Sequence, residues 1–230
     1  MASPAENLAC DEALLSACND GEEVLRFWEP AQYFVVLGYA NKAATEANLS
    51  FCQEKNIPVL RRCTGGGTVL QGPGCLNYSL ILRIGSDAGL QSISATNRYV
   101  LKRHQETLAQ LLNAPVSVQG SSDLVVGGLK FSGNAQRRGK DYLIFHGSYL
   151  LDFDIGLMEK VLPMPSSQPG YRANRSHRDF LTNLRIESGL LKQALKRAWN
   201  ASDAPVNVPT EVISRLVQDK YARHEWNFKF

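Results

Sequence analysis

The chain has 230 residues, enough to bury the core of one large α/β domain or two small domains. Hydrophobic residues make up 44% of the sequence and charged residues 20%, a composition that excludes wholesale disorder. The formal net charge is only +3, so neither nucleic acid nor an anionic membrane is expected as a partner.

The first 84 residues predict helices interspersed with short strands. An apolar stripe at helical spacing opens the chain, and Asn19-Asp20-Gly21 is typical of a helix end. Glu29-Pro30 separates the first two strands and indicates a hairpin or meander, and Gly72-Pro73-Gly74 indicates a turn. The predicted elements are a helix over residues 5–18, strands over 24–28 and 33–37, a helix over 47–55, and strands over 57–61, 67–70 and 77–84.

A long helix, a series of strands and an irregular stretch are predicted next. Asn113-Ala114-Pro115 is typical of the end of the long helix. Residues 162–179 hold three prolines and no periodicity, which predicts a long exposed loop of the kind that often forms a lid or a binding segment. The predicted elements are a helix over 91–113, strands over 117–119, 124–126, 129–132 and 142–152, helices over 188–199 and 209–221, and an aromatic tail over 224–230.

The order of these elements indicates the fold class. Strands and helices are mixed without the regular βαβ alternation of a doubly wound fold. We therefore expect an α+β fold, with mixed or antiparallel β-sheets flanked by helices that pack on one face.

The densest candidate site is the segment Arg61-Arg62-Cys63-Thr64-Gly65-Gly66-Gly67-Thr68, between two predicted strands. Three consecutive glycines lose much chain entropy on folding, and a flexible turn is their usual interpretation. The two arginines change that interpretation, because bare backbone N–H groups beside guanidinium groups form a positive cradle for phosphate or carboxylate. The segment matches neither a Walker loop nor a dinucleotide-binding fingerprint.

A second candidate site begins at Asp123. Gly127-Gly128 predicts a hairpin turn that projects Lys130 from the start of the next strand. Small residues and two arginines follow Lys130, so an anion could approach the backbone there and be held by several cations. Asp123 lies across the turn and could hold Mg²⁺. His146 lies in an apolar strand, where a lone histidine is more often structural than catalytic.

The five cysteines indicate the compartment more than the chemistry. They form an odd set without a Cys-x-x-Cys pair, so neither a disulfide scaffold nor a zinc site is expected: Cys10, Cys18, Cys52, Cys63 and Cys75. A thiolate beside the arginine pair would be a nucleophile, but a free cysteine is usually a small buried hydrophobe. No apolar run approaches the roughly 18 to 20 residues of a membrane span, and the first residues do not form a secretory signal. We expect the cytoplasm or an organelle matrix.

Together these segments resemble the lipoate–protein ligase catalytic domain, within the biotin/lipoate ligase and octanoyltransferase superfamily. The matching segments are residues 7–15, 25–30 with 35–41, 61–69, 77–80, 128–137 and 146–151. The resemblance implies one catalytic domain over residues 1–230, with the α+β fold of class II biotin/lipoate ligases. The two-domain ligase continues into an accessory domain after a Trp-Asn-Phe segment, whereas this sequence stops after Trp226-Asn227-Phe228 with Lys229-Phe230. The accessory domain is therefore expected to be absent, and a separate accessory polypeptide is possible.

The resemblance also implies a reaction. Such a ligase activates lipoate with ATP and Mg²⁺ to lipoyl-adenylate and passes the lipoyl group to a lysine of a lipoyl domain or a glycine-cleavage H-type carrier protein. Lys130 would be the catalytic lysine at the acyl carbonyl and the α-phosphate, Asp123 the metal ligand, and residues 171–183 the mobile adenylate-binding loop. The residues implied to bind substrate or nucleotide are Arg61, Arg62, Gly65, Gly66, Gly67, Thr68, Asn77, Ser132, Gly133, Asn134, Ala135, Arg137, His146 and Gly147.

Two alternatives stay open. An octanoyltransferase moves an acyl chain from acyl carrier protein without ATP, through a cysteine thioester. The two positions where that superfamily places the cysteine correspond to residues 168–171 and 115–122, which contain no cysteine. However, Gln71-Gly72 replaces the His-Asp of many ligases, and the following Gly72-Pro73-Gly74 is more similar to the octanoyltransferases. The other alternative is a non-catalytic relative that binds lipoyl proteins.

Overall fold

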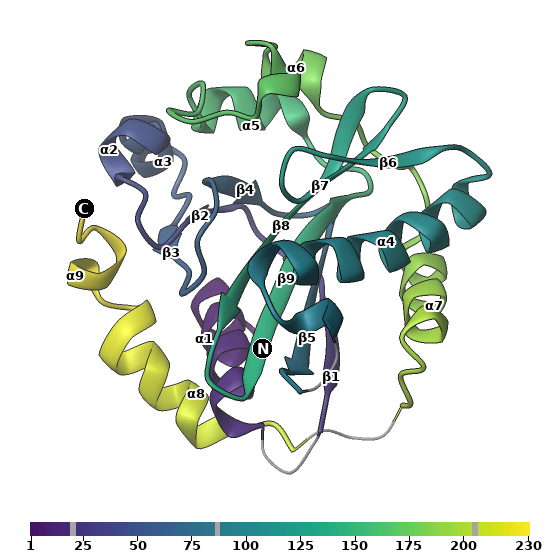
Figure 1. Ribbon diagram of the computed structural model, residues 1–230. Helices are drawn as coiled ribbons and strands as arrows, with labels where there is room; N and C mark the ends of the chain where they lie inside the picture. Colours follow the sequence, from purple (N-terminus) through teal and green to yellow (C-terminus); the bar gives the residue numbers. More distant parts are fainter. Residues whose placement is uncertain (19–21, 86–87, 204–206) are drawn as a thin grey trace.

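A six-stranded antiparallel sheet forms the centre of the computed structural model, which describes residues 1–18, 22–85, 88–203 and 207–230 (Figure 1). The strand order is β1-β5-β9-β8-β7-β6. The strands are β1 (Val24–Trp28), β5 (Cys75–Arg83), β6 (Val116–Gln119), β7 (Asp123–Val126), β8 (Leu129–Arg138) and β9 (Tyr142–Leu150). The central strands β5 and β9 pair along their whole lengths, from Cys75 opposite Leu150 to Arg83 opposite Tyr142.

A second, three-stranded sheet packs against one face of the first. Its order is β3-β2-β4, with β2 parallel to β3 and antiparallel to β4. The strands are β2 (Phe34–Leu37), β3 (Val59–Arg61) and β4 (Val69–Gln71). The expected hairpin of the first two strands is wrong, because β1 pairs with β5 in the large sheet and β2 lies in the small one. All four residues of β2 are buried, so both faces of this strand must be covered by other elements. A hairpin with the edge strand β1 would not supply that cover.

Helices cover both faces of the large sheet. The helices α4 and α7 pack on one face, and α1 and α8 lie with the small sheet on the other. The expectation of helices on one face is therefore wrong; β5 is buried along both faces, so both need cover. The helices are α1 (Pro4–Ala17), α2 (Ala43–Glu46), α3 (Leu49–Glu54), α4 (Ile93–Leu112), α5 (Ile155–Val161), α6 (His177–Phe180), α7 (Ser188–Ala198), α8 (Thr210–Leu216) and α9 (His224–Asn227). In the described ranges, no helix has the length and apolarity needed to cross a membrane.

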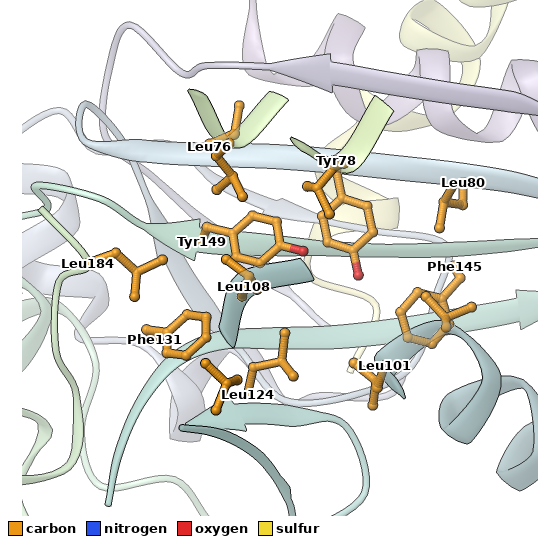
Figure 2. Packing of buried hydrophobic residues seen from close by; sticks show 14 of the residues in the cluster. Leu76, Tyr78, Leu80, Leu101, Leu108, Leu124, Phe131, Phe145, Tyr149 and Leu184 are labelled. Atoms are coloured by element: carbon orange, nitrogen blue, oxygen red, sulfur yellow. The ribbon is translucent and has the colours of Figure 1, made fainter. Parts of the chain in front are cut away.

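The core beneath α4 and α7 follows the two-residue period of the strands. Tyr78 of β5 and Tyr149 of β9 stack with a ring distance of 5.3 Å, and Figure 2 shows them among the leucines of the neighbouring elements. Residues at the alternate positions of the two strands face the other side of the sheet, where Ile81 of β5 and Ile144 of β9 pack with Leu14 of α1. The large sheet thus separates two hydrophobic clusters, and the α+β architecture with mixed and antiparallel sheets is confirmed.

Several element boundaries differ from the expectation. The strand predicted over residues 129–132 continues to Arg138, because pairing with β9 holds its polar second half in the sheet. The stretch over 162–179 is neither wholly exposed nor unstructured: it contains a 3₁₀ turn at Gly170–Arg172 and the start of α6, and Arg172 and His177 are buried. Neither α5 nor α9 was predicted, and the predicted helix end at residues 19–21 lies outside the described residues.

Gly147 on β9 provides a test of this packing. A Cβ at this position would lie 1.9 Å from Asn134 Oδ1 and 2.8 Å from the Gly133 carbonyl oxygen. We expect Gly147→Ala to lower the free energy of unfolding by about 1 to 3 kcal/mol in urea denaturation. Gly189 on α7 has no atom within 4 Å of the corresponding position, so the control Gly189→Ala should raise it by up to about 1 kcal/mol. Equal effects of the two substitutions would contradict the close approach of β8 and β9 at Gly147.

Candidate active site

A cavity of about 520 Å³ lies between the two sheets and the segment that follows α5. Its walls come from β4, β5, β8 and β9, from the glycine loop over residues 66–68 and from residues 165–181. The predicted site residues that line it are Arg62, Gly66, Gly67, Thr68, Asn77, Asp123, Lys130, Ser132, Gly133, Asn134, Ala135, His146 and Gly147. Segments far apart in the sequence therefore meet at one place.

A β-bulge in β8 sets the direction of Lys130. Leu124 of β7 pairs with Ser132, but the next residue, Val125, pairs with Lys130, so Phe131 is an extra residue in β8. Side chains alternate along a regular strand, and without the extra residue Lys130 would lie on the same side as Leu124, which is buried beneath α4. The bulge turns Lys130 to the opposite side, toward the cavity.

The Lys130 ammonium lies in the cavity with one carboxylate as its partner. Its Nζ is 2.8 Å from Asp123 Oδ1, and the side chains are 24% and 12% exposed. The other carboxylate oxygen, Asp123 Oδ2, accepts a hydrogen bond from the Tyr171 hydroxyl at 2.7 Å. Burial, followed by the Asp123 charge, raises the pKa of Tyr171, which therefore stays a donor. An anion that reaches Lys130 must compete with Asp123. Through Tyr171, Asp123 also connects Lys130 to residues 165–181, the segment over the cavity.

His146 connects the glycine loop to the first helix. Its Nε2 is 2.7 Å from Thr64 Oγ1, and its Nδ1 is 3.0 Å from Asp11 Oδ2. Thr64 Oγ1 already accepts from Arg62 Nε, so its own proton is free for Nε2, and the proton of a neutral His146 is assigned to Nδ1. Asp11 also pairs with Arg26 at 2.7 Å. Burial alone would raise the pKa of Asp11, but His146 and Arg26 outweigh it and hold the pKa below its ordinary value.

Arg62 folds the glycine loop around its own guanidinium group. Its Nη2 donates to the carbonyl oxygens of Gly65 at 2.6 Å and Gly67 at 2.8 Å. Gly66 has a φ of +87°, and a Cβ there would lie 2.9 Å from the same nitrogen, so the position requires glycine. Burial lowers the pKa of Arg62 to about 10, so the group stays charged near neutral pH. Among the described residues, the amide N–H groups of Gly66 and Gly67 have no acceptor, which leaves them available to an anion in the cavity.

Three predicted residues do not line the cavity. Arg61 is fully buried elsewhere, and its guanidinium donates only to main-chain oxygens, those of Trp226, Gly38, Tyr39, Asn41 and Asn227. The expectation that Arg61 lines the pocket is therefore wrong: it anchors α9 to the loop after β2. Gly65 is exposed but does not line the cavity, and Arg137 pairs with Glu12 at 2.9 Å.

One part of the cavity is apolar. Its side chains belong to a single hydrophobic cluster between the small sheet, α5 and α6. They are Leu70, Leu150, Met158, Leu162, Phe180 and Leu181. Because a buried CH₂ group gains about 0.8 kcal/mol over its exposed state, this part of the cavity favours an aliphatic chain.

A ring of three polar side chains lies in the same cavity. Asn77 Nδ2 donates to Gln71 Oε1 at 3.0 Å, Gln71 Nε2 donates to Ser148 Oγ at 3.0 Å, and Ser148 donates back to Asn77 Oδ1. Each amide group uses one of its two N–H donors in this ring. Gln71 is thus part of the cavity wall.

None of the five cysteines lines the cavity. Cys63 and Cys75, the two nearest to the glycine loop in sequence, are 7% and 2% exposed. Burial raises the pKa of Cys75 to about 12 and also raises the pKa of the other four thiols. The cavity therefore contains no thiol and no activated thiolate.

The acidic residues of the cavity do not form a preformed metal site. Within the described ranges, no three His, Cys, Asp or Glu side chains group to hold an ion. Asp11 is bound by His146 and Arg26, and Asp123 by Lys130 and Tyr171. A Mg²⁺ ion would need to bring most of its oxygen ligands with it, as one bound to phosphates does.

Several residues of the site were not predicted from the sequence. Asp11 was only part of a helical pattern, because its partner His146 lies 135 positions further along the chain. Arg172 and His177 belong to the stretch that was predicted to be exposed, and Ser148 carried no signal beyond its strand. A cation inside an otherwise irregular Pro-rich stretch was the one signal that could have indicated Arg172.

Comparisons with known proteins identify the family of the chain. Residues 3–199 match the family model described as the lipoyl protein ligase A/B catalytic domain. The octanoyltransferase LipM of Brevibacillus brevis is 30% identical over 271 aligned positions, covering 99% of this chain and 95% of that protein. The lipoate-protein ligase LplJ of Bacillus subtilis is 26% identical and covers 98% of this chain and 70% of that protein.

A solved structure shows the same fold. It describes an archaeal lipoylation system, a bipartite lipoate protein ligase and its E2 lipoyl domain from Thermoplasma acidophilum. The TM-score is 0.85 at 23% sequence identity, with 97% of this chain and 91% of that chain covered. The expected α+β ligase-type fold is therefore confirmed.

The link between Asp11 and His146 predicts a pH dependence of stability. A carboxyl group whose pKa is depressed by folding stabilises the folded state above its unfolded pKa, and this contribution is lost as the pH falls through the folded pKa. We expect Asp11→Asn to lower the free energy of unfolding at pH 7, by about 3 kcal/mol for a broken buried pair. The difference from wild type should shrink as the pH falls below the ordinary Asp value of 3.8. Urea denaturation across pH 3 to 7 measures it, and a difference that grows on acidification would contradict the pairing.

Proposed function

The chain belongs to the lipoyl protein ligase A/B catalytic domain family, and from this premise we propose that it is an ATP-dependent lipoate–protein ligase. It would activate lipoate to lipoyl-adenylate and transfer the lipoyl group to a lysine of a carrier domain. The observation that carries this proposal is a cavity with a lysine ammonium, free loop amides and an apolar part, but no thiol. Such a cavity can bind an acyl phosphate anhydride and has no group to form a thioester.

The first step forms the anhydride. A carboxylate oxygen of lipoate attacks the α-phosphorus of ATP, the bond to the β-phosphate oxygen breaks, and pyrophosphate leaves. Lys130 would exchange Asp123 for the oxygens that gain charge in this step. A fixed cation at such oxygens stabilises the transition state more than the ground state. The amide N–H groups of Gly66 and Gly67 would add neutral donors beside it.

The second step transfers the acyl group. The neutral amine of the carrier lysine attacks the acyl carbonyl carbon, the bond to the adenylate oxygen breaks, AMP leaves, and the surplus proton passes to solvent. The cluster of Leu70, Met158 and Phe180 would hold the aliphatic chain, so that only the carbonyl end meets the amine. His146, fixed between Thr64 and Asp11, keeps the glycine loop in place during both steps.

Mg²⁺ and the protein partners complete the proposal. Mg²⁺ would arrive on the ATP phosphates, neutralise their charge, and take Asp123 as its protein ligand. The acceptor would be a lipoyl domain or an H-type carrier protein, and the bipartite Thermoplasma ligase supports a separate accessory polypeptide. Residues 1–230 would form one catalytic domain that acts in the cytoplasm or an organelle matrix.

The second candidate function is octanoyl or lipoyl transfer from acyl carrier protein without ATP. The similarity to LipM, which extends over 95% of that protein, favours it. The positions of the thiols oppose it, because Cys63 and Cys75 are buried outside the cavity and their pKa values are raised.

The role of Lys130 is tested by pyrophosphate exchange. We expect wild-type protein to catalyse lipoate- and Mg²⁺-dependent exchange between ATP and pyrophosphate, and Lys130→Ala to slow it by about 100- to 1,000-fold. The matched control is Lys140→Ala, which removes an exposed lysine from the turn between β8 and β9 and should leave the rate unchanged. Exchange that survives in Lys130→Ala would exclude the assigned role.

The thiols give a test that separates the two candidate functions. We expect Cys63→Ala and Cys75→Ala each to retain ATP-dependent lipoylation of a carrier domain within about threefold, because neither thiol reaches the cavity. Gel-shift or mass analysis of the carrier measures this, and thermal unfolding shows whether each variant is folded. Octanoyl transfer from acyl carrier protein without ATP, abolished by either substitution in a folded variant, would favour the transferase instead.

A further inference from the structure

Arg172 is a buried cation that forms no salt bridge with any of the residues the structure describes. Its side chain lines the cavity, and the residue is 5% exposed. Its Nε donates to the Arg175 carbonyl oxygen at 3.0 Å, and its Nη2 lies 3.5 Å from His177 Nδ1. Within the described ranges it pairs with no carboxylate, so most of its five N–H donors are unused. Burying an unpaired charge is costly, which indicates that this group meets an anion when the protein works.

The other two permanent cations of the cavity differ from Arg172. Arg62 donates to the carbonyl oxygens of its own loop, and Lys130 pairs with Asp123. Arg172 therefore has the largest unused capacity to bind an anion among the described cavity residues. The burial of Arg172 lowers its pKa, but a guanidinium group remains charged at neutral pH.

The backbone around Arg172 is built to hold it. Ala173 and Asn174, the next two residues, have φ values of 50° and 57°, an uncommon left-handed conformation for residues with a side chain. Arg175 fixes this turn, because its Nη2 donates to the Tyr171 carbonyl oxygen at 2.9 Å. The Arg172 guanidinium also lies 4.8 Å from the centre of the Phe180 ring, which orients the group without neutralising it.

The groups around Arg172 favour an anionic ligand. Arg175 also lies over Phe180, at 5.2 Å, and has no carboxylate partner among the described residues. Burial and the charge of Arg172 lower the pKa of His177, so this histidine adds an acceptor and no charge at neutral pH. The nearest acid of the cavity, Asp123, is balanced by Lys130. Arg175 uses its donors on main-chain oxygens and does not line the cavity, so Arg172 provides the free charge. The fork of N–H donors on a guanidinium group matches the oxygens of a phosphate group.

From this geometry we infer that Arg172 forms an anion subsite that binds a phosphate group of the acyl-donating substrate. This inference rests on the proposed function and names a part of its site. For a ligase the phosphate belongs to the polyphosphate of ATP, or to the pyrophosphate that leaves. For a transferase it belongs to the phosphopantetheine arm of acyl carrier protein. The chemistry is the same, and the source is decided by experiment.

The subsite also explains how the segment over the cavity would respond to substrate. Tyr171 bonds Asp123, and Arg172 lies next to it in the 3₁₀ turn. A phosphate on Arg172 would thus hold the same turn that contacts the partner of Lys130. The residue that contacts the phosphate and the residue that contacts Asp123 would thus be neighbours in one turn.

The test compares two arginines that differ in position but not in charge. Arg172→Gln removes the buried group, and the control Arg178→Gln removes an arginine of α6 that is 65% exposed and pairs with Glu159. Isothermal titration measures binding of ATP–Mg²⁺, pyrophosphate, 4′-phosphopantetheine as the probe for the carrier-protein arm, and lipoate. We expect Arg172→Gln to weaken at least one phosphate probe by about 10- to 100-fold, as expected for a lost charged hydrogen bond. Lipoate binding should change less than about twofold, and Arg178→Gln should resemble wild type.

The outcomes separate the subsite from the proposed function. Weaker binding of ATP and pyrophosphate supports both, whereas weaker binding of 4′-phosphopantetheine alone supports the subsite and contradicts the ligase. The subsite is overturned if the wild-type protein binds no phosphate probe, or if the Arg172→Gln variant binds all of them normally. In that case pyrophosphate exchange by the wild-type protein still tests the ligase. Arg172→Met removes the charge but keeps an apolar contact with Phe180. If Arg172→Gln is unfolded, a tenfold loss of phosphate-probe binding in Arg172→Met supports the subsite, and unchanged binding overturns it.

Discussion

The direction of one ammonium group depends on one extra residue in a strand. Because Phe131 is additional in β8, Lys130 leaves the side of the sheet that packs under α4 and meets Asp123 in the cavity. A regular strand would bury the ammonium among leucines, where a charge is strongly disfavoured. The glycine loop, His146 and the residues after α5 are all placed around this position, so the chemistry of the cavity follows from the register of two strands.

Most charges of the cavity are already satisfied by the protein, and this determines what a ligand can use. Arg62 is bound by its own loop, and Asp11 is held between His146 and Arg26. These internal contacts fix the loop before substrate arrives, which lowers the cost of ordering it on binding. What remains available is Lys130 in exchange for Asp123, the free loop amides, and the buried guanidinium of Arg172.

Much of the fold and of the site could be predicted from the sequence, and the remainder depends on contacts distant along the chain. The long helix, β5 and β9 follow from their own apolar patterns, and the glycine loop and lysine segment from their composition. Arg61 and Arg62 are adjacent and chemically identical, yet Arg61, at the end of β3, anchors α9, and Arg62, just after the strand, lines the cavity. Neither the bulge at Phe131 nor the contact of Asp11 with His146 can be predicted from the residues next to them in the sequence.

The ligase and the transferase differ in whether the acyl group ever becomes covalently attached to the protein, and mass spectrometry distinguishes these cases most directly. Protein incubated with lipoate, ATP and Mg²⁺ is measured under native and then denaturing conditions, in parallel with protein incubated with octanoyl carrier protein. We predict a complex with the mass of bound lipoyl-adenylate that is lost on denaturation, and no acyl adduct in either sample. An acyl adduct that survives denaturation, formed from the carrier protein without ATP, would contradict this account.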